Sequence, residues 1–172
     1  MGRQITDDDY TFVYFEVIKQ LGPQRILDVG LFLQRIGALC RQAMSCEIPA
    51  DTVLDGVDVF GGHFPIYDRV YDAVFAGNPA DGAPSAGAPF CGTGFAEISG
   101  GPYDLICAMD VTPHMGPDTR AAFFKALPAL GRSVLADCTD PQFNDFLVQN
   151  YELTPLSSGG KQFVLGNLKE GK

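Results

Sequence analysis

Polar residues with binding chemistry stand where several apolar segments of this sequence end. They are Asp28 and Gly30 in the segment 25–30, Asp58 in 52–60, Asn78 after 73–76, and Asp110 at the end of 103–110. Carboxylate oxygens accept hydrogen bonds, and several carboxylates together favour a cationic ligand. A glycine at such a point permits a positive φ angle and a close backbone approach. The pattern predicts a binding site built from segment ends.

A histidine close to the last of these acids is the weak candidate for catalysis. His114 lies four residues after Asp110, and an imidazole titrates near neutral pH, as a general base must. Pro113 precedes it, so a loop histidine that hydrogen-bonds backbone groups is the competing interpretation. No nucleophile motif of the Gly-x-Ser-x-Gly kind and no phosphate-binding Gly-Lys-Ser/Thr loop is present. The catalytic residues stay unknown at this level.

The periodicity of the chain predicts the elements that position these residues. Residues 6–9 (Thr-Asp-Asp-Asp) are typical of a helix start, and one apolar stripe follows up to Gly22. Its members are Tyr10, Val13, Tyr14, Val17, Ile18 and Leu21. Further helices are predicted over 33–44, 65–72, 117–130 and 142–149. Strands are predicted over 25–30, 52–60, 73–76, 103–110 and 133–136.

The order of these elements predicts the fold class. Strands that alternate with helices indicate a mostly parallel sheet with helices on both faces, a Rossmann-like three-layer α/β/α sandwich. Segments 151–157 and 162–168 flank Ser-Gly-Gly and predict a hairpin that adds an antiparallel strand at one edge. We expect a single domain over 1–172, with an N-terminal helix in 1–22, a core over 25–168 and a long loop over 78–94. In such sheets, ligands bind beyond the carboxyl ends of the strands.

Four motifs in this order resemble the class I S-adenosylmethionine-dependent methyltransferase family. They are residues 25–30 (Arg-Ile-Leu-Asp-Val-Gly), 54–60 (Leu-Asp-Gly-Val-Asp-Val-Phe), 71–78 (Tyr-Asp-Ala-Val-Phe-Ala-Gly-Asn) and 103–114, which closes on Asp-Val-Thr-Pro-His. The resemblance implies that Asp28, Gly30, Asp58, Asn78 and Asp110 bind the cofactor. Asp58 would accept from the ribose diol, and Asn78, in place of the usual acid, would lie near the adenine. Asp28 is either a cofactor contact or a charge at a helix N-terminus.

The turn after the first motif departs from the family pattern acid-x-Gly-x-Gly-x-Gly. Phe32 and Gln34 occupy the second and third glycine positions. A bulky residue forced into left-handed geometry costs about 1–3 kcal/mol, so we expect a turn of another shape, with Phe32 or Leu33 filling the pocket. Two interpretations remain open. One is methyl transfer from S-adenosylmethionine to an unidentified small molecule; the other is a degenerate, non-methylating member that binds another ligand or a protein partner.

The composition of the chain limits the classes of binding partner and indicates a cellular compartment. The net charge of −9 and the lack of any Lys/Arg run argue against nucleic acid as a partner. No apolar stretch approaches the roughly 20 residues of a membrane span. The five cysteines form no Cys-x-x-Cys pair and only two histidines are present, so no metal site is expected. We expect a cytoplasmic protein with reduced thiols, Cys107 and Cys138 being small core residues. Asp137 and Asp140 are taken as solvated loop acids.

Overall fold

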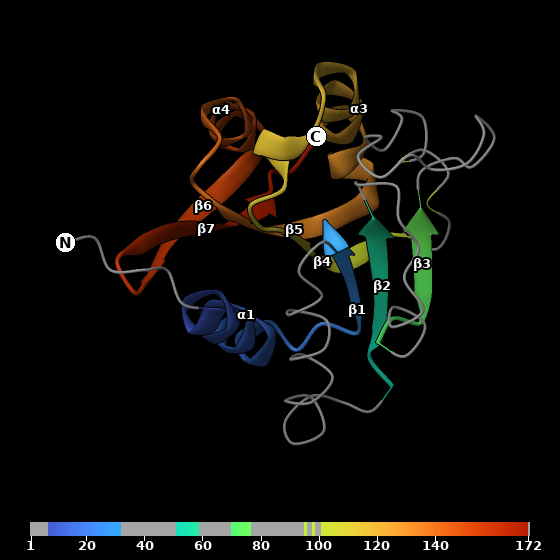
Figure 1. The fold of residues 1–172 in the computed structure, drawn as a ribbon, viewed down its shortest axis with the longest axis vertical. Coiled ribbons are helices and arrows are strands. Elements are labelled where there is room, and N and C mark those ends of the chain that lie inside the picture. The colour runs from blue at the N-terminus through green and yellow to red at the C-terminus, as the bar shows by residue number, and fades with distance from the viewer. Residues whose placement is uncertain are drawn as a thin grey trace.

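The computed structural model describes residues 7–31, 51–58, 70–76, 95, 98 and 101–171. Side chains of the first helix are described from Val13 onward, and Asp58 and Ala76 are described by their backbone alone. Within these residues, one sheet of seven strands lies between helices (Figure 1).

Seven strands join in the order β3-β2-β1-β4-β5-β7-β6. Their bounds are β1 Arg25–Val29, β2 Val53–Asp58, β3 Ala73–Ala76, β4 Tyr103–Ala108, β5 Gly131–Asp137, β6 Tyr151–Ser158 and β7 Lys161–Leu168. Strands β1 to β5 are parallel, and β7 is antiparallel to both β5 and β6. The chain order reverses at β1, which pairs with β2 on one side and β4 on the other. This reversal is the switch point at which open α/β sheets bind ligands.

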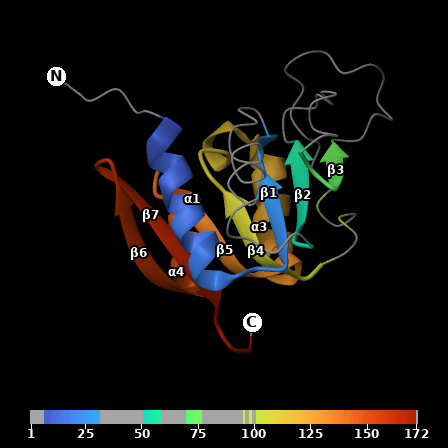
Figure 2. The same cartoon turned by 90° about the horizontal axis from the view of Figure 1, so that it is seen from below.

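Helices cover both faces of the sheet. Helix α1 (Asp7–Leu21) packs on one face, and helices α3 (Pro117–Leu130) and α4 (Pro141–Asn150) pack on the other (Figures 1 and 2). Alternate residues of the strands supply the two cores, as the pleat requires. In β4, for example, Leu105 contacts the α1 layer and Ile106 contacts the α3–α4 layer. The predicted three-layer architecture is confirmed.

Local sequence explains most of the element boundaries. Gly131 ends α3, and Asp140 begins α4 by accepting hydrogen bonds from the backbone N–H groups of Gln142 and Phe143. Gly159 and Gly160, both at positive φ, form the predicted turn between β6 and β7. The helix predicted over 65–72 is not found at its last three residues, which form a turn and a bend; its remainder and the helix predicted over 33–44 lie outside the described residues.

The described helices also bear on membrane insertion. None of them combines the length and the apolar character that crossing a bilayer requires.

Candidate functional site

The carboxyl ends of the parallel strands meet at one edge of the sheet. Register places Val29 of β1 beside Val57 of β2, and Ala108 of β4 beside Ala136 of β5. The next residues are Gly30, Asp58 and Asp137, and Asp110 comes two residues after Ala108, so all four lie along this edge of the sheet. The sequence predicted Gly30, Asp58 and Asp110 as site residues.

Gly30 makes the turn at the end of β1. Its φ is 95°, and its N–H donates a 2.8 Å hydrogen bond to the carbonyl oxygen of Val57. A Cβ at this position would stand 2.6 Å from Cγ2 of Val111, which is buried beside Asp110. The turn requires a glycine both for its positive φ and for this close approach to the end of β4.

Asp28 lies within β1, two residues before the turn, and its side chain is buried in the α1 layer. The hydroxyl of Tyr71 donates to its Oδ2 at 2.7 Å, and the hydroxyl of Tyr14 donates to its Oδ1 at 3.5 Å. Burial raises the pKa of Asp28 to about 6, although the two tyrosine hydrogen bonds act in the opposite direction. Tyr71 is itself buried, so its ring packs in the interior while its hydroxyl makes this hydrogen bond.

Asp110 follows β4 with a backbone conformation that is uncommon outside glycine. Its φ is 50°, in the left-handed region that residues other than glycine rarely adopt. Strained backbone of this kind concentrates at functional sites. His114 ends the short 3-10 helix η5 (Thr112–His114), and its Nε2 lies 3.9 Å from Oδ1 of Asp110. Both side chains are about half exposed, at 53% and 52%, so the pair is open to solvent.

Asp137 ends β5 and is a candidate site residue that the sequence analysis missed. It is only 4% exposed, and its Oδ2 accepts a 2.8 Å hydrogen bond from the hydroxyl of Thr139. The backbone N–H of Asp110 also donates to its carboxylate, which ties the ends of β4 and β5 together. Burial raises the pKa of Asp137. The assignment of Asp137 and Asp140 to solvated loops was wrong, since both are buried. Asp137 ends an apolar strand, and a position at the end of such a strand was the signal that pointed to Asp110.

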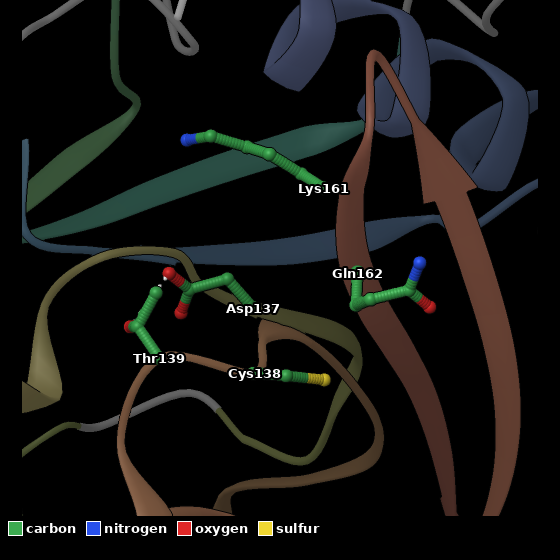
Figure 3. Close-up of a pocket in the computed structure, with 5 residues that line it drawn as sticks. All are labelled: Asp137, Cys138, Thr139, Lys161 and Gln162. Carbon is green, nitrogen blue, oxygen red and sulfur yellow. Dashed lines mark hydrogen bonds between the residues drawn. The ribbon is translucent and has the colours of Figure 1, made fainter. Parts of the chain in front are cut away.

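A pocket of about 200 Å³ opens beside the end of β5 and the start of β7 (Figure 3). Its lining residues are Asp137, Cys138, Thr139, Lys161 and Gln162. A 3.3 Å hydrogen bond from the N–H of Cys138 to the carbonyl oxygen of Gln162 joins its two walls. Cys107 is fully buried as expected, but Cys138 is partly exposed and lines this pocket, so its assignment to the core was wrong. Burial raises the pKa of the Cys138 thiol, and the negative charge of Asp137 raises it further.

Several predicted site residues cannot be placed in full. The backbone of Asp58 ends β2 beside Ala76 of β3, where the resemblance puts the ribose acceptor. Asn78, Phe32, Gln34 and the loop 78–94 lie outside the described residues. Among the residues that are described, no three His, Cys, Asp or Glu side chains gather as a metal site would require.

Comparisons with known proteins identify the fold. No protein-family model matches the chain, and no curated protein matches it. Solved structures do match over nearly the whole chain. A methyltransferase from Geobacter sulfurreducens superposes with a TM-score of 0.59 at 14% identity, covering 96% of this chain and 82% of that one.

Two further solved structures contain the cofactor or its product. An O-methyltransferase from Bacillus cereus, bound to S-adenosylhomocysteine, has a TM-score of 0.57 at 13% identity and covers 98% and 84% of the two chains. The O-methyltransferase TomG from Streptomyces achromogenes, bound to S-adenosylmethionine, has a TM-score of 0.55 at 15% identity and covers 96% and 82%. These matches confirm the predicted class I S-adenosylmethionine-dependent methyltransferase fold.

Proposed function

We propose that this chain binds S-adenosylmethionine beyond the carboxyl ends of β1, β2 and β4 and transfers its methyl group to a small molecule. One observation carries the proposal. Gly30 holds a positive-φ turn at the switch point of the sheet, packed without room for a Cβ against the end of β4. The fold and the cofactors of its solved neighbours support this assignment.

The proposed cofactor contacts follow the strand ends. The turn at Gly30 lets the backbone approach the methionyl part of the cofactor. Asp58, the last residue of β2, would accept from the ribose diol, and Asn78 would pair with the adenine. Asp110 would add negative charge near the sulfonium. Asp28 lies in the interior below the turn, where its carboxylate accepts hydrogen bonds from two tyrosine hydroxyls. In this position it would stabilise the end of β1 and would not extend into solvent.

The proposed reaction needs alignment and exclusion of water more than acid–base groups. The cofactor supplies an activated methyl group: a bond forms from the acceptor to the methyl carbon, the carbon–sulfur bond breaks, and S-adenosylhomocysteine leaves. An oxygen acceptor also releases one proton. His114 is the candidate to take it, because its half-exposed imidazole stands at this edge of the sheet, with Nε2 3.9 Å from Oδ1 of Asp110.

The alternative is a degenerate member of the family that does not methylate. The specific observation in its favour is the pair Phe32 and Gln34, which stand where the family has glycines. In that case the sheet would hold another ligand or a protein partner. Cofactor binding separates the two functions without requiring knowledge of the acceptor.

Calorimetric titration with S-adenosylmethionine and S-adenosylhomocysteine tests the proposal. Micromolar binding supports methyl transfer, whereas an absence of heat at millimolar ligand supports the degenerate alternative. The double variant Phe32→Gly with Gln34→Gly is the informative comparison. If these side chains obstruct the site, the variant binds the cofactor more tightly than the wild type. A folded variant that still ignores the cofactor would place the obstruction elsewhere.

The proposal extends to partners and compartment. The acidic chain, at a net charge of −9, suits a small molecule better than nucleic acid. The compartment we propose is the cytoplasm, where thiols such as those of Cys107 and Cys138 stay reduced.

A further inference from the structure

We propose that the pocket between the end of β5 and the start of β7 binds a small hydroxycarboxylic acid. On the proposed function, this molecule is the methyl acceptor. The pocket lies beside Asp137, whose carboxylate is tied to the backbone of Asp110, and so adjoins the strand ends assigned to the cofactor. Of its lining residues only Asp137 ends a parallel strand; Cys138 and Thr139 follow β5, and Lys161 and Gln162 begin β7.

The size of the pocket limits the ligand. Its volume of about 200 Å³ is below the roughly 300–1,000 Å³ of sites that hold drug-sized molecules. At ~30 Å³ for each water in the liquid, about seven waters fill it. The fitting ligand is therefore a fragment such as a monocyclic acid, and not a nucleotide or a peptide.

The polar groups of the pocket define the polar groups that the ligand must carry. Lys161, Asp137 and Thr139 extend to one side in Figure 3, and Cys138 and Gln162 extend to the other. Lys161 brings a cation to the pocket of a chain whose net charge is −9. An ammonium group at a half-buried position favours a carboxylate. The ligand therefore presents an anion toward Lys161.

The hydroxyl of the ligand faces a second group on the same side of the pocket, a buried acceptor. Asp137 already accepts the hydroxyl of Thr139 at 2.8 Å, and a carboxylate oxygen has room for a second donor. We expect that donor to be a hydroxyl, because the positive charge of Lys161 in the same pocket would repel a ligand ammonium. Burial raises the pKa of Asp137 and so disfavours its charged form, which also favours a neutral hydroxyl over a cation as its partner.

Chemical-shift mapping by NMR with 4-hydroxybenzoate tests this proposal without the cofactor. The probe should produce saturable shifts of the backbone amides of Thr139 and Gln162. Its methyl ester, which keeps the hydroxyl but lacks the anion, and the Lys161→Gln variant should each weaken binding by about tenfold, the effect of losing one charge pair at a half-buried site. Lys125→Gln is the matched control, since Lys125 is exposed on α3, and it should leave binding unchanged.

The outcomes separate this proposal from the proposed function. Shifts that fail to saturate, that map away from the β5–β7 pocket, or that are equal in wild type and Lys161→Gln overturn the pocket assignment. Calorimetry with S-adenosylhomocysteine on the same samples reports the cofactor site independently. Cofactor binding without probe binding defeats only the pocket proposal, and probe binding without cofactor binding defeats only methyl transfer.

Discussion

The hydroxyl of Tyr71 donates a 2.7 Å hydrogen bond to Oδ2 of Asp28 inside the layer between the sheet and α1. The two residues are 43 positions apart, and the bond joins the end of β1 to the segment that leads into β3. Tyr14 of α1 reaches the other carboxylate oxygen from a longer distance, 3.5 Å. A buried acid supported in this way fixes three elements directly beneath the turn at Gly30.

Removing the Tyr71 hydroxyl should destabilise the fold more than removing the Tyr14 hydroxyl. Tyr71→Phe leaves a buried carboxylate oxygen without its short hydrogen bond, and a bond to a charged group contributes about 1.5–3 kcal/mol. Tyr14→Phe is the matched control, because it deletes the same atom from a bond 0.8 Å longer (3.5 − 2.7 Å). Urea unfolding at pH 7.5 measures both. An equal or larger loss in Tyr14→Phe would contradict the assigned geometry.

The stability of the fold should fall with rising pH because of Asp28. Burial raises its pKa from 3.8 to about 6. The native state therefore binds more protons than the unfolded state in this window, and the contribution of Asp28 to the free energy of unfolding falls as pH rises through it. Asp28→Asn removes the effect. Between pH 4 and 7, the free energy of unfolding of the variant should therefore rise relative to that of the wild type by about 1–3 kcal/mol.

Unfolding free energies of wild type and Asp28→Asn across that pH range check this expectation. Asp137 is present in both proteins, so its own titration cancels in the difference. A difference that stays flat, or that favours the wild type as pH rises, would show that Asp28 is not held as a desolvated acid.

Gly30→Ala should be costly for two separable reasons. Left-handed backbone strain contributes about 1–3 kcal/mol, and the new Cβ would stand 2.6 Å from Cγ2 of Val111. Gly22→Ala isolates the strain, because Gly22 also has a positive φ but has open space around it. In thermal unfolding, the midpoint temperature of Gly30→Ala should lie well below that of Gly22→Ala. Val111→Ala in the Gly30→Ala background should recover part of the loss, and the absence of any such coupling would argue against the contact.

The cap of α4 yields a prediction that separates two roles of one carboxylate. Asp140 accepts from the N–H groups of Gln142 and Phe143, and its Oδ2 lies 3.6 Å from Nη1 of Arg120. Asp140→Ala loses both roles and should cost about 1–3 kcal/mol. Asp140→Asn keeps a good N-cap and loses only the charge, so it should cost less. Equal losses in urea unfolding would mean that the ion pair, and not the cap, dominates.

The sequence predicted the elements well because their signals are local. The apolar run before Asp110 and the alternation around Gly159 and Gly160 each lie within a few residues, so strand and hairpin could be assigned without any tertiary information. The turn at Gly30 was likewise predicted from its strand. For the same reason, the class of fold followed from the order of the elements alone.

The burial of polar residues could not be predicted in this way. Asp137 was assigned to a solvated loop, yet it is buried, and its carboxylate accepts from the hydroxyl of Thr139 and the backbone of Asp110. Tyr14, Asp28 and Tyr71 form a network only because three separate elements pack together. Whether a strand-end acid is buried depends on its neighbours across the sheet, and those come from distant positions of the chain.

NMR titration of the ¹⁵N-labelled protein with S-adenosylhomocysteine tests the central claim most directly, since it reports both binding and place. If the cofactor binds as proposed, saturable shifts appear at micromolar ligand and are largest at the amides of Gly30, Leu31 and Asp110, where β1 and β4 end. Spectra that do not change at millimolar ligand, or shifts confined to residues away from this edge of the sheet, would contradict it.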